Sequence, residues 1–226
     1  MLIHIGANDM NGGQGEYKEN DKPSNHDFIK PGYLKKYHKI YFIECIPSVY
    51  KILDKNLNYI NSKFSKNYIP IQELVTSKSD EIKNFNIIGY KKKYIQKTNK
   101  HNAFASSSIY TPLYLLKKFP NLHVTKTIPI KSISFPDLIK KYNINIDKKF
   151  DLTLDTQGNE LDILKGMNEY LKMVDILITE FTENKNHYLN GCKFKELDTF
   201  LKKNNFSLIQ KDNKNHGNAT YKNNNF

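Results

Sequence analysis

The sequence predicts an α/β protein built on an open, mostly parallel β-sheet with an antiparallel hairpin at its C-terminal edge. Apolar runs of strand length alternate with segments of helical periodicity along most of the chain. Two of these runs close on an acid, at Glu44 and, after Phe150–Leu154, at Asp155. Near the C-terminus, residues 206–210 and 217–222 are strand-like with no helix between them, which is typical of a hairpin.

The first half of the chain supplies three predicted strands, with a predicted helix after each of the first two. The second of these helices carries apolar residues every three to four positions, and the hydroxyl group of Ser48 can cap its start. In chain order we expect a strand at 2–6, a helix at about 28–37 interrupted by Pro31 and Gly32, a strand at 39–44, a helix from about Ser48 to about Ile60, and a strand at 68–75.

Residues 80–110 carry no helical periodicity. The segments 82–85 and 90–95 alternate between apolar and polar side chains, and Ile88 and Gly89 lie between them, so we expect a small hairpin inserted after the third strand. A chain of 226 residues has the length of one α/β domain. We therefore expect a single domain over 1–226, with this insertion at about 80–110.

The second half returns to alternating strands and helices before the closing hairpin. The predicted elements are an extended segment at 124–130, a short helix at 134–142, the strand that ends at Asp155, a helix from 159 to about 171, a strand at 175–180, a helix at 193–203, and the hairpin strands 206–210 and 217–222.

Small and acidic residues at the ends of the first two strands indicate a nucleoside site. The first strand ends in a turn at Gly6, and Glu44 follows 38 residues later. In a βαβ unit of this kind, a small residue lets the backbone approach the ligand, and an acid on the next strand accepts both ribose hydroxyls. The Gly-x-Gly-x-x-Gly fingerprint of dinucleotide enzymes is missing.

Asp155 lies at a third strand end, followed at once by a helical pattern. The carboxyl ends of parallel strands line the ligand crevice of an open sheet, so Asp155 is placed where chemistry can occur. The alternative is an ordinary strand-to-helix loop in which Asp155 caps the helix.

Five segments, in order along nearly the whole chain, resemble the FkbM-type S-adenosylmethionine-dependent methyltransferases. They are Ile5-Gly6-Ala7-Asn8-Asp9, Phe42-Ile43-Glu44-Cys45-Ile46-Pro47, Ser106-Ser107-Ser108, Ile128-Pro129-Ile130-Lys131-Ser132-Ile133 and Asp155-Thr156-Gln157-Gly158-Asn159-Glu160. The chain departs from the family pattern at His4, where the family often has Asp, and at Cys45-Ile46-Pro47, where Pro-Asn-Pro is more usual.

The resemblance implies a class I methyltransferase fold, which is Rossmann-like, and S-adenosyl-L-methionine as cofactor. Gly6, Ala7 and Asn8 would lie near its methionine part, and Glu44 would hold the ribose. Cys45 and Ile46 would flank the adenine, and the segment 74–77 would pass the adenine edge. The implied cofactor-binding residues are Gly6, Ala7, Asn8, Asp9, Glu44, Cys45, Ile46, Leu74 and Ser77. We expect Gly6→Val to block the cofactor and leave the fold largely intact.

Methyl transfer to an oxygen atom needs a hydroxyl in line with the methyl group and, for an ordinary alcohol, a base. Asp155 is the first candidate for base or substrate-orienting group, and Glu180, at the end of the neighbouring strand, is the second. Glu180 has an alternative role as a strand-end acid satisfied by backbone donors or a Lys. His187 falls in the polar segment 184–190, which favours a surface position over a catalytic one.

Two further features leave alternatives open. Asp155 and Glu180 offer two oxygen ligands for a divalent metal, but no spacing fixes a third, so no metal is assigned. Ser106-Ser107-Ser108 either binds a polar substrate through its hydroxyl groups or forms a turn.

Composition bounds the partners and the compartment. The net charge is +12, yet all 35 basic residues are Lys, which lacks the planar fork of Arg that grips phosphate at two points. This pattern is what A+T-rich codons produce, and the alternative is an anionic partner. The two cysteines, Cys45 and Cys192, form no disulfide scaffold, and no leader or membrane span is visible, so we expect a cytoplasmic protein with no membrane partner.

Three function classes follow. The resemblance favours an O-methyltransferase that acts on a sugar, a glycan or another small hydroxylated acceptor. The positive charge speaks for an RNA 2′-O-methyltransferase, but the missing Arg speaks against it. The third class is a non-catalytic module that binds adenosylmethionine. The sequence leaves the acceptor and the oligomeric state open.

Overall fold

The computed structural model describes residues 1–10, 16, 36–91, 104–183 and 187–226. The predicted helix at 28–37, apart from its last two residues, and the Gly-rich loop after Met10 therefore lie outside the described residues, as does most of the predicted strand 90–95.

A seven-stranded sheet forms the centre of the molecule, in the order β3-β2-β1-β7-β8-β10-β9. The pairs β3·β2, β2·β1, β1·β7 and β7·β8 are parallel, and β10 is antiparallel to both of its neighbours. This sheet confirms the predicted Rossmann-like methyltransferase fold. The edge strand on the C-terminal side is β9, and β10 lies between β8 and β9. The strands are β1 Leu2–Ile5, β2 Lys39–Ile43, β3 Asn67–Ile71, β7 Phe150–Leu154, β8 Val174–Thr182, β9 Phe206–Lys211 and β10 His216–Asn223.

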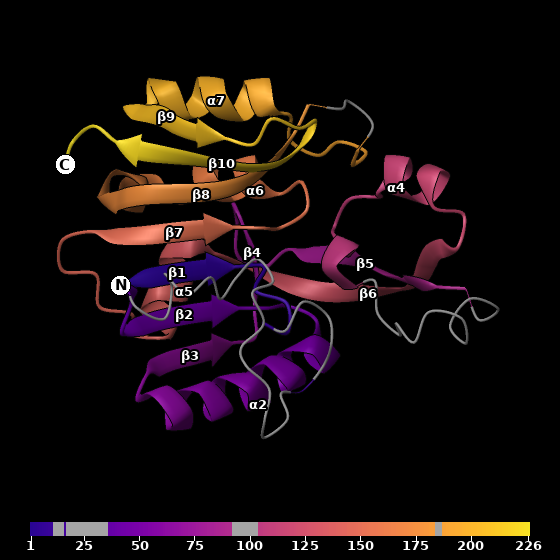
Figure 1. Ribbon diagram of the computed structural model, residues 1–226, viewed down its shortest axis with the longest axis horizontal. Coiled ribbons are helices and arrows are strands. Elements are labelled where there is room, and N and C mark those ends of the chain that lie inside the picture. Colours follow the sequence, from indigo (N-terminus) through magenta and orange to yellow (C-terminus); the bar gives the residue numbers. More distant parts are fainter. Residues whose placement is uncertain (11–15, 17–35, 92–103, 184–186) are drawn as a thin grey trace.

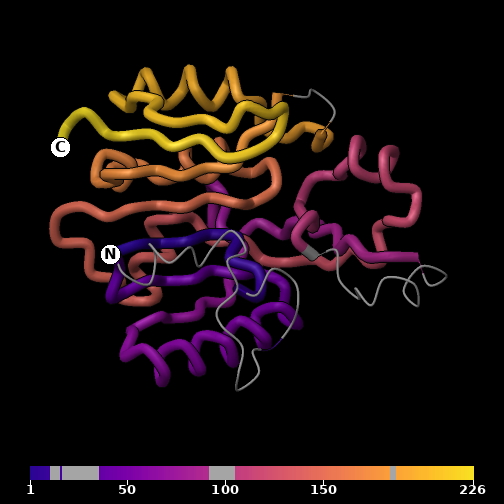
Figure 2. The backbone as a smooth tube through the Cα atoms, in the orientation of Figure 1, coloured from indigo at the N-terminus to yellow at the C-terminus, as the bar shows by residue number. Residues whose placement is uncertain are grey.

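Successive residues of β1 face opposite sides of the sheet, and each side has its own helices. Leu2 packs in a cluster with α2 (Pro47–Phe64), whereas Ile3 and Ile5 belong to a larger cluster that includes residues of α5 (Phe135–Lys141), α6 (Glu160–Gly166) and α7 (Phe194–Lys203). The alternation of the pleat thus divides an almost wholly apolar strand between two cores. The arrowheads of β1, β2, β3 and β7 point to one side, and both chain ends lie on the other (Figures 1 and 2).

A second sheet, in the order β4-β6-β5, extends from the side to which those arrowheads point (Figure 1). It comprises β4 Leu74–Thr76, β5 Ile82–Tyr90 and β6 Leu122–Ser134, with η1 Phe104–Ser106 and α4 Leu113–Lys118 in the connection. The hairpin predicted within 80–95 is wrong, because β5 runs unbroken through Gly89 and pairs antiparallel with β6. Ile88-Gly89 is a bulge site rather than a turn: the register shifts between Ile87 and Ile88.

Three other boundaries differ from the prediction. Residues 68–75 divide between β3 in the first sheet and β4 in the second. The helix α2 begins at Pro47, with Ile46 and not Ser48 at its N-cap position. The helix expected at 159–171 stops at Gly166 and continues as the 3₁₀ helix η2 (Asn168–Met173), because Asn168 has a φ of 53°.

Within the described ranges, no helix is long and apolar enough to cross a membrane.

Candidate active site

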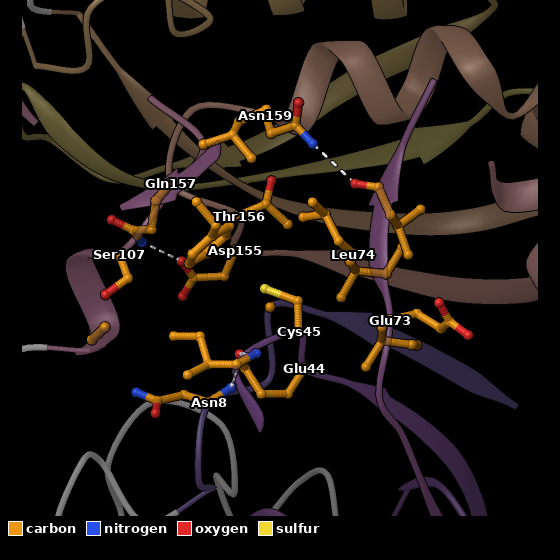
Figure 3. Close-up of a pocket in the computed structure, with 18 residues that line it drawn as sticks. Asn8, Glu44, Cys45, Glu73, Leu74, Ser107, Asp155, Thr156, Gln157 and Asn159 are labelled. Carbon is orange, nitrogen blue, oxygen red and sulfur yellow. Dashed lines mark hydrogen bonds between the residues drawn. The ribbon is translucent and has the colours of Figure 1, made fainter. Parts of the chain in front are cut away.

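A cavity lies at the carboxyl edge of the central sheet, where β1, β2 and β7 end and the second sheet begins (Figure 3). It holds about 680 Å³ of empty space when the open mouth is included. Its lining residues are Ile5, Gly6, Asn8, Ile43, Glu44, Cys45, Ile46, Glu73, Leu74, Val75, Phe85, Ala105, Ser107, Ile109, Asp155, Thr156, Gln157 and Asn159.

Gly6 makes the turn that opens this cavity. The backbone amides of Gly6 and Ala7 both donate to the carbonyl of Ile43 at 3.0 Å, and Gly6 has a φ of +84°. A Cβ atom on Gly6 would lie 1.8 Å from the backbone oxygen of Asp155. The expectation that Gly6→Val leaves the fold intact is therefore wrong, because any side chain there collides with the backbone after β7.

Glu44 is held by backbone donors on both of its carboxylate oxygens. The amide of Asn8 donates to one at 3.0 Å and the amide of Ile46 to the other at 2.8 Å. A carboxylate has about four acceptor positions, so Glu44 can accept ligand hydroxyls beside these donors. Burial raises the pKa of Glu44 to about 7, although hydrogen bonds from the amides of Ile46, Asn8 and Cys45 and from the Cys45 thiol lower it. We call Gly6, Asn8, Glu44 and Ile46 the β1–β2 wall.

Asp155 belongs to a network of side chains on the opposite wall. One carboxylate oxygen accepts from the Nε2 of Gln157 at 2.5 Å, and the same Nε2 donates to Glu180 at 2.8 Å. The Oε1 of Gln157 accepts the hydroxyl of Tyr188, and its backbone oxygen accepts the hydroxyl of Ser108 at 2.8 Å. We call these five residues the β7–β8 wall, although only Asp155 and Gln157 line the cavity and the other three lie behind them.

Glu160 shapes the loop that joins β7 to α6. Its buried carboxylate accepts the amides of Thr156 at 2.8 Å and of Gly158 at 3.0 Å, and it also accepts the Thr156 hydroxyl. Burial, together with the charge of Glu180, raises the pKa of Glu160. The N-cap position of α6 is Asn159, so Asp155 is not the helix cap that sequence alone allowed.

Glu180 faces away from the cavity toward two histidines. Its second oxygen lies 3.0 Å from the Nε2 of His216, whose ring stacks on His187 with centroids 4.2 Å apart. Burial lowers the pKa of His216, but the bond and charge of Glu180 outweigh it and raise that pKa overall. The predicted surface position of His187 is wrong, since only 7% of it is exposed and Tyr114 stacks on its ring.

The structure brings seven of the predicted site residues together and leaves four outside the lining. Ala7 is fully buried in the core beside α2, and the carbonyl of Asp9 accepts the amide of Asn56. Ser77 binds the carboxylate of Asp162 through its amide and hydroxyl. Glu180 is the fourth. Those in the lining are Gly6, Asn8, Glu44, Cys45, Ile46, Leu74 and Asp155.

Sequence reasoning missed several lining residues. Glu73 is an acid two residues past β3, so the strand-end rule that found Glu44 could have found it. No such signal marks Phe85 or Ala105, which reach the cavity from the second sheet and from η1. Ser107, which the sequence offered as part of a segment that could bind a polar substrate, does line the cavity, and its hydroxyl accepts the amide of Ile88 at 3.0 Å.

The charge of the cavity is opposite to that of the chain. The described lining holds three carboxylates, Glu44, Glu73 and Asp155, and no Lys or His. Lys141 and the hydroxyl of Tyr142 bind Glu73, whereas Glu44 accepts from backbone amides and Asp155 accepts from the side-chain amide of Gln157. No group of three or more His, Cys, Asp or Glu side chains in that part could hold a metal ion.

A comparison with protein-family models matches the methyltransferase FkbM domain over residues 4–208 of the 226. The chain belongs to the FkbM methyltransferase family. Membership supports methyltransferase activity and implies a methyl donor. Neither the comparison with curated proteins nor that with solved structures gave a match.

Proposed function

We propose that this FkbM-family protein is an S-adenosylmethionine-dependent O-methyltransferase that acts on a sugar, a glycan or another small hydroxylated acceptor. The observation that carries the proposal is the acidic cavity at the carboxyl edge of the sheet, with Glu44 on one wall and Asp155 on the other.

The described residues fit the proposed cofactor. S-adenosylmethionine carries a positive sulfonium, and when bound it would supply an electrophilic methyl group. Glu44 is placed to accept ribose hydroxyls, and Gly6 leaves the turn open to the ligand. Leu74 and Ile46 offer apolar surface for the adenine. A phosphate-bearing dinucleotide fits less well, because the described lining has no basic side chain to balance its charge.

Asp155 is placed to act on the acceptor. In the proposed step the acceptor oxygen bonds to the methyl carbon, the carbon–sulfur bond breaks toward sulfur, and the hydroxyl proton passes to Asp155. The carboxylate lies on the wall opposite Glu44 (Figure 3). In the proposal one carboxylate therefore serves the cofactor ribose and the other serves the acceptor hydroxyl. General-base catalysis of this kind typically contributes about 10²–10⁴-fold.

The same charge pattern ranks the alternatives. An RNA 2′-O-methyltransferase needs cationic groups near the acceptor ribose, and the described cavity lining supplies none. A non-catalytic binding module has no need of Asp155 in a network of five side chains beside the cofactor space.

Calorimetry and a methyl-transfer screen test the proposal. We expect S-adenosylmethionine and its demethylated product to bind, and NAD⁺ to bind at least tenfold more weakly. Labelled cofactor is then offered with sugars, nucleotide sugars and capped RNA, with Asp155→Asn as the matched control. Binding without transfer to any acceptor would favour the non-catalytic module, and transfer to capped RNA alone would favour the RNA enzyme.

A further inference from the structure

We propose that Gln157 is a positioning residue that orients the Asp155 carboxylate, and that Glu180 acts on the reaction only through Gln157. This inference rests on the proposed function and reassigns Glu180 from a candidate catalytic residue to an anchor. Three observations support it: the bonds of the Gln157 amide, the backbone that carries it, and the position of Glu180.

The amide of Gln157 bridges two carboxylates. Its NH₂ group has two hydrogens, and the Nε2 atom lies 2.5 Å from Asp155 and 2.8 Å from Glu180. Two carboxylates so close to one neutral donor repel each other, and the two N–H bonds offset part of that repulsion. The Asp155 carboxylate is thereby held at the cavity by a partner that is itself anchored at its far side.

Tyr188 fixes which way this amide points. A glutamine amide can rotate by half a turn, which would present its oxygen to the two carboxylates. The hydroxyl of Tyr188 donates to the Oε1 of Gln157, so the oxygen is held on the tyrosine side and the NH₂ group on the acid side. Only 3% of Tyr188 is exposed.

The backbone of Gln157 is also adapted to this role. Gln157 has a φ of 59°, a conformation that few side chains other than Gly, Asn and Asp adopt readily. The hydroxyl of Ser108 donates to its carbonyl at 2.8 Å and so ties the loop to the segment after η1. A residue in a strained conformation that bonds to four separate partners is typical of a functional constraint.

Glu180 cannot touch an acceptor in the cavity. It is absent from the cavity lining and lies beside Phe181, Tyr188 and His216 in a separate, smaller pocket. Its two carboxylate oxygens bind Gln157 and His216 respectively. The Gln157 amide is the hydrogen bond that connects Glu180 to the cavity lining, so we expect an effect of Glu180 on turnover to pass through it.

Four variants separate positioning from direct catalysis. Gln157→Asn tolerates the positive φ but has an amide one methylene too short to reach both acids. Tyr188→Phe removes only the orienting hydroxyl. Glu180→Gln keeps an oxygen that accepts from Gln157, whereas Glu180→Ala removes the anchor.

Glu183→Gln and Tyr170→Phe are matched controls, since Glu183 pairs with Lys211 and Tyr170 packs on Phe135, both outside the site.

We expect Gln157→Asn and Glu180→Ala to lower kcat about 10–100-fold and Tyr188→Phe about tenfold, with cofactor affinity changed less than twofold. Glu180→Gln should retain kcat within about threefold of wild type, because its amide oxygen replaces the anchor. Equal losses in Glu180→Gln and Glu180→Ala would overturn the assignment and make the Glu180 charge a direct participant. An unchanged kcat in Gln157→Asn would overturn it as well.

A second measurement does not depend on turnover. The carboxyl carbon of Asp155 can be followed by NMR through a pH titration of the protein without ligands. Loss of the Gln157 donor should move its titration midpoint to higher pH in Gln157→Asn, because a hydrogen bond to the charged form is removed. An unmoved midpoint would refute the positioning role even if the protein has no methyltransferase activity, whereas a moved midpoint without activity would fault the proposed function alone.

Discussion

The two walls of the cavity hold their carboxylates by different means. On the β1–β2 wall, backbone amides at the ends of two elements fix Glu44. On the β7–β8 wall, Asp155 depends on Gln157, which depends in turn on Tyr188, Ser108 and Glu180. The donors to Glu44 are backbone amides, whose positions follow from the fold whatever side chains they carry. The groups that hold Asp155 are particular side chains, so each of them has to be present in the sequence.

Gly6→Ala tests a contact that joins the two walls, and it should have the largest effect. The added Cβ would meet the backbone of Asp155 at 1.8 Å in a conformation that disfavours side chains, so we expect a loss of roughly 2–6 kcal/mol in the free energy of unfolding. Chemical denaturation measures it. Gly89→Ala is the control, because there the Cβ meets only the methyl group of Thr125, at 2.7 Å, and a smaller loss should result. Equal losses in both variants would show that the close approach at Gly6 is not special.

Asp155→Asn tests the β7–β8 wall alone. The change keeps the size of the side chain and removes the base, so the methyl-transfer rate should fall about 10²–10⁴-fold. Cofactor affinity should change little, because Glu44 and its amides are untouched. Melting temperature and transfer rate are measured on the same preparation. A stable variant with the wild-type rate would remove Asp155 from the mechanism.

Sequence alone predicted the β1–β2 wall better than the β7–β8 wall, for a physical reason. Gly6, Glu44 and Asp155 stand at strand ends, and a strand end is a local pattern. The partners of Asp155 are local only in part: Gln157 is two residues away, but Glu180 and Tyr188 come from segments that the fold brings in. The sequence around His187 is polar and predicted a surface position. Its ring stacks on His216 and Tyr114, which are distant in sequence, so these contacts could not be predicted from the residues beside it.

The fold shows the same division. The parallel strands and the helices α2, α5, α6 and α7 could be predicted, because periodicity is local, whereas α4 was not predicted. The partner of β5 could not, since β6 begins 32 residues after β5 ends, and Gly89 resembled a turn. Its lack of a side chain serves the packing against Thr125 of β6, a contact that only the folded sheet creates.

Glu44→Ala tests the β1–β2 wall and should act on cofactor affinity more than on turnover at saturation. Each charge-assisted bond lost from a ribose hydroxyl should cost about 1.5–3 kcal/mol of binding free energy. Calorimetry with adenosine and 2′-deoxyadenosine sharpens the test: wild type should discriminate between them, and Glu44→Ala should not. Unchanged adenosine affinity in the variant would place the ribose elsewhere.

The last and smallest effect is a pH dependence confined to the β1–β2 wall. Burial raises the pKa of Glu44 from its ordinary value of 4.5 to about 7, so in the free protein this carboxyl is half protonated near neutrality. Ribose hydroxyls donate best to the ionised form, and adenosine affinity should therefore fall up to tenfold for each pH unit below about 7. Adenosine is the suitable ligand, because it lacks the amino group of adenosylmethionine, which titrates in the same range. The pH also affects the free energy of unfolding, in the opposite direction to adenosine affinity.

Because the pKa of Glu44 is raised in the folded state, it contributes stability that is fully present below pH 4.5 and is lost as the pH rises through 7. The difference between wild type and Glu44→Gln isolates both effects from those of other buried groups, such as His4, whose pKa burial lowers to about 3. Parallel pH profiles of adenosine affinity in the two proteins would show that Glu44 does not hold the ribose in its ionised form.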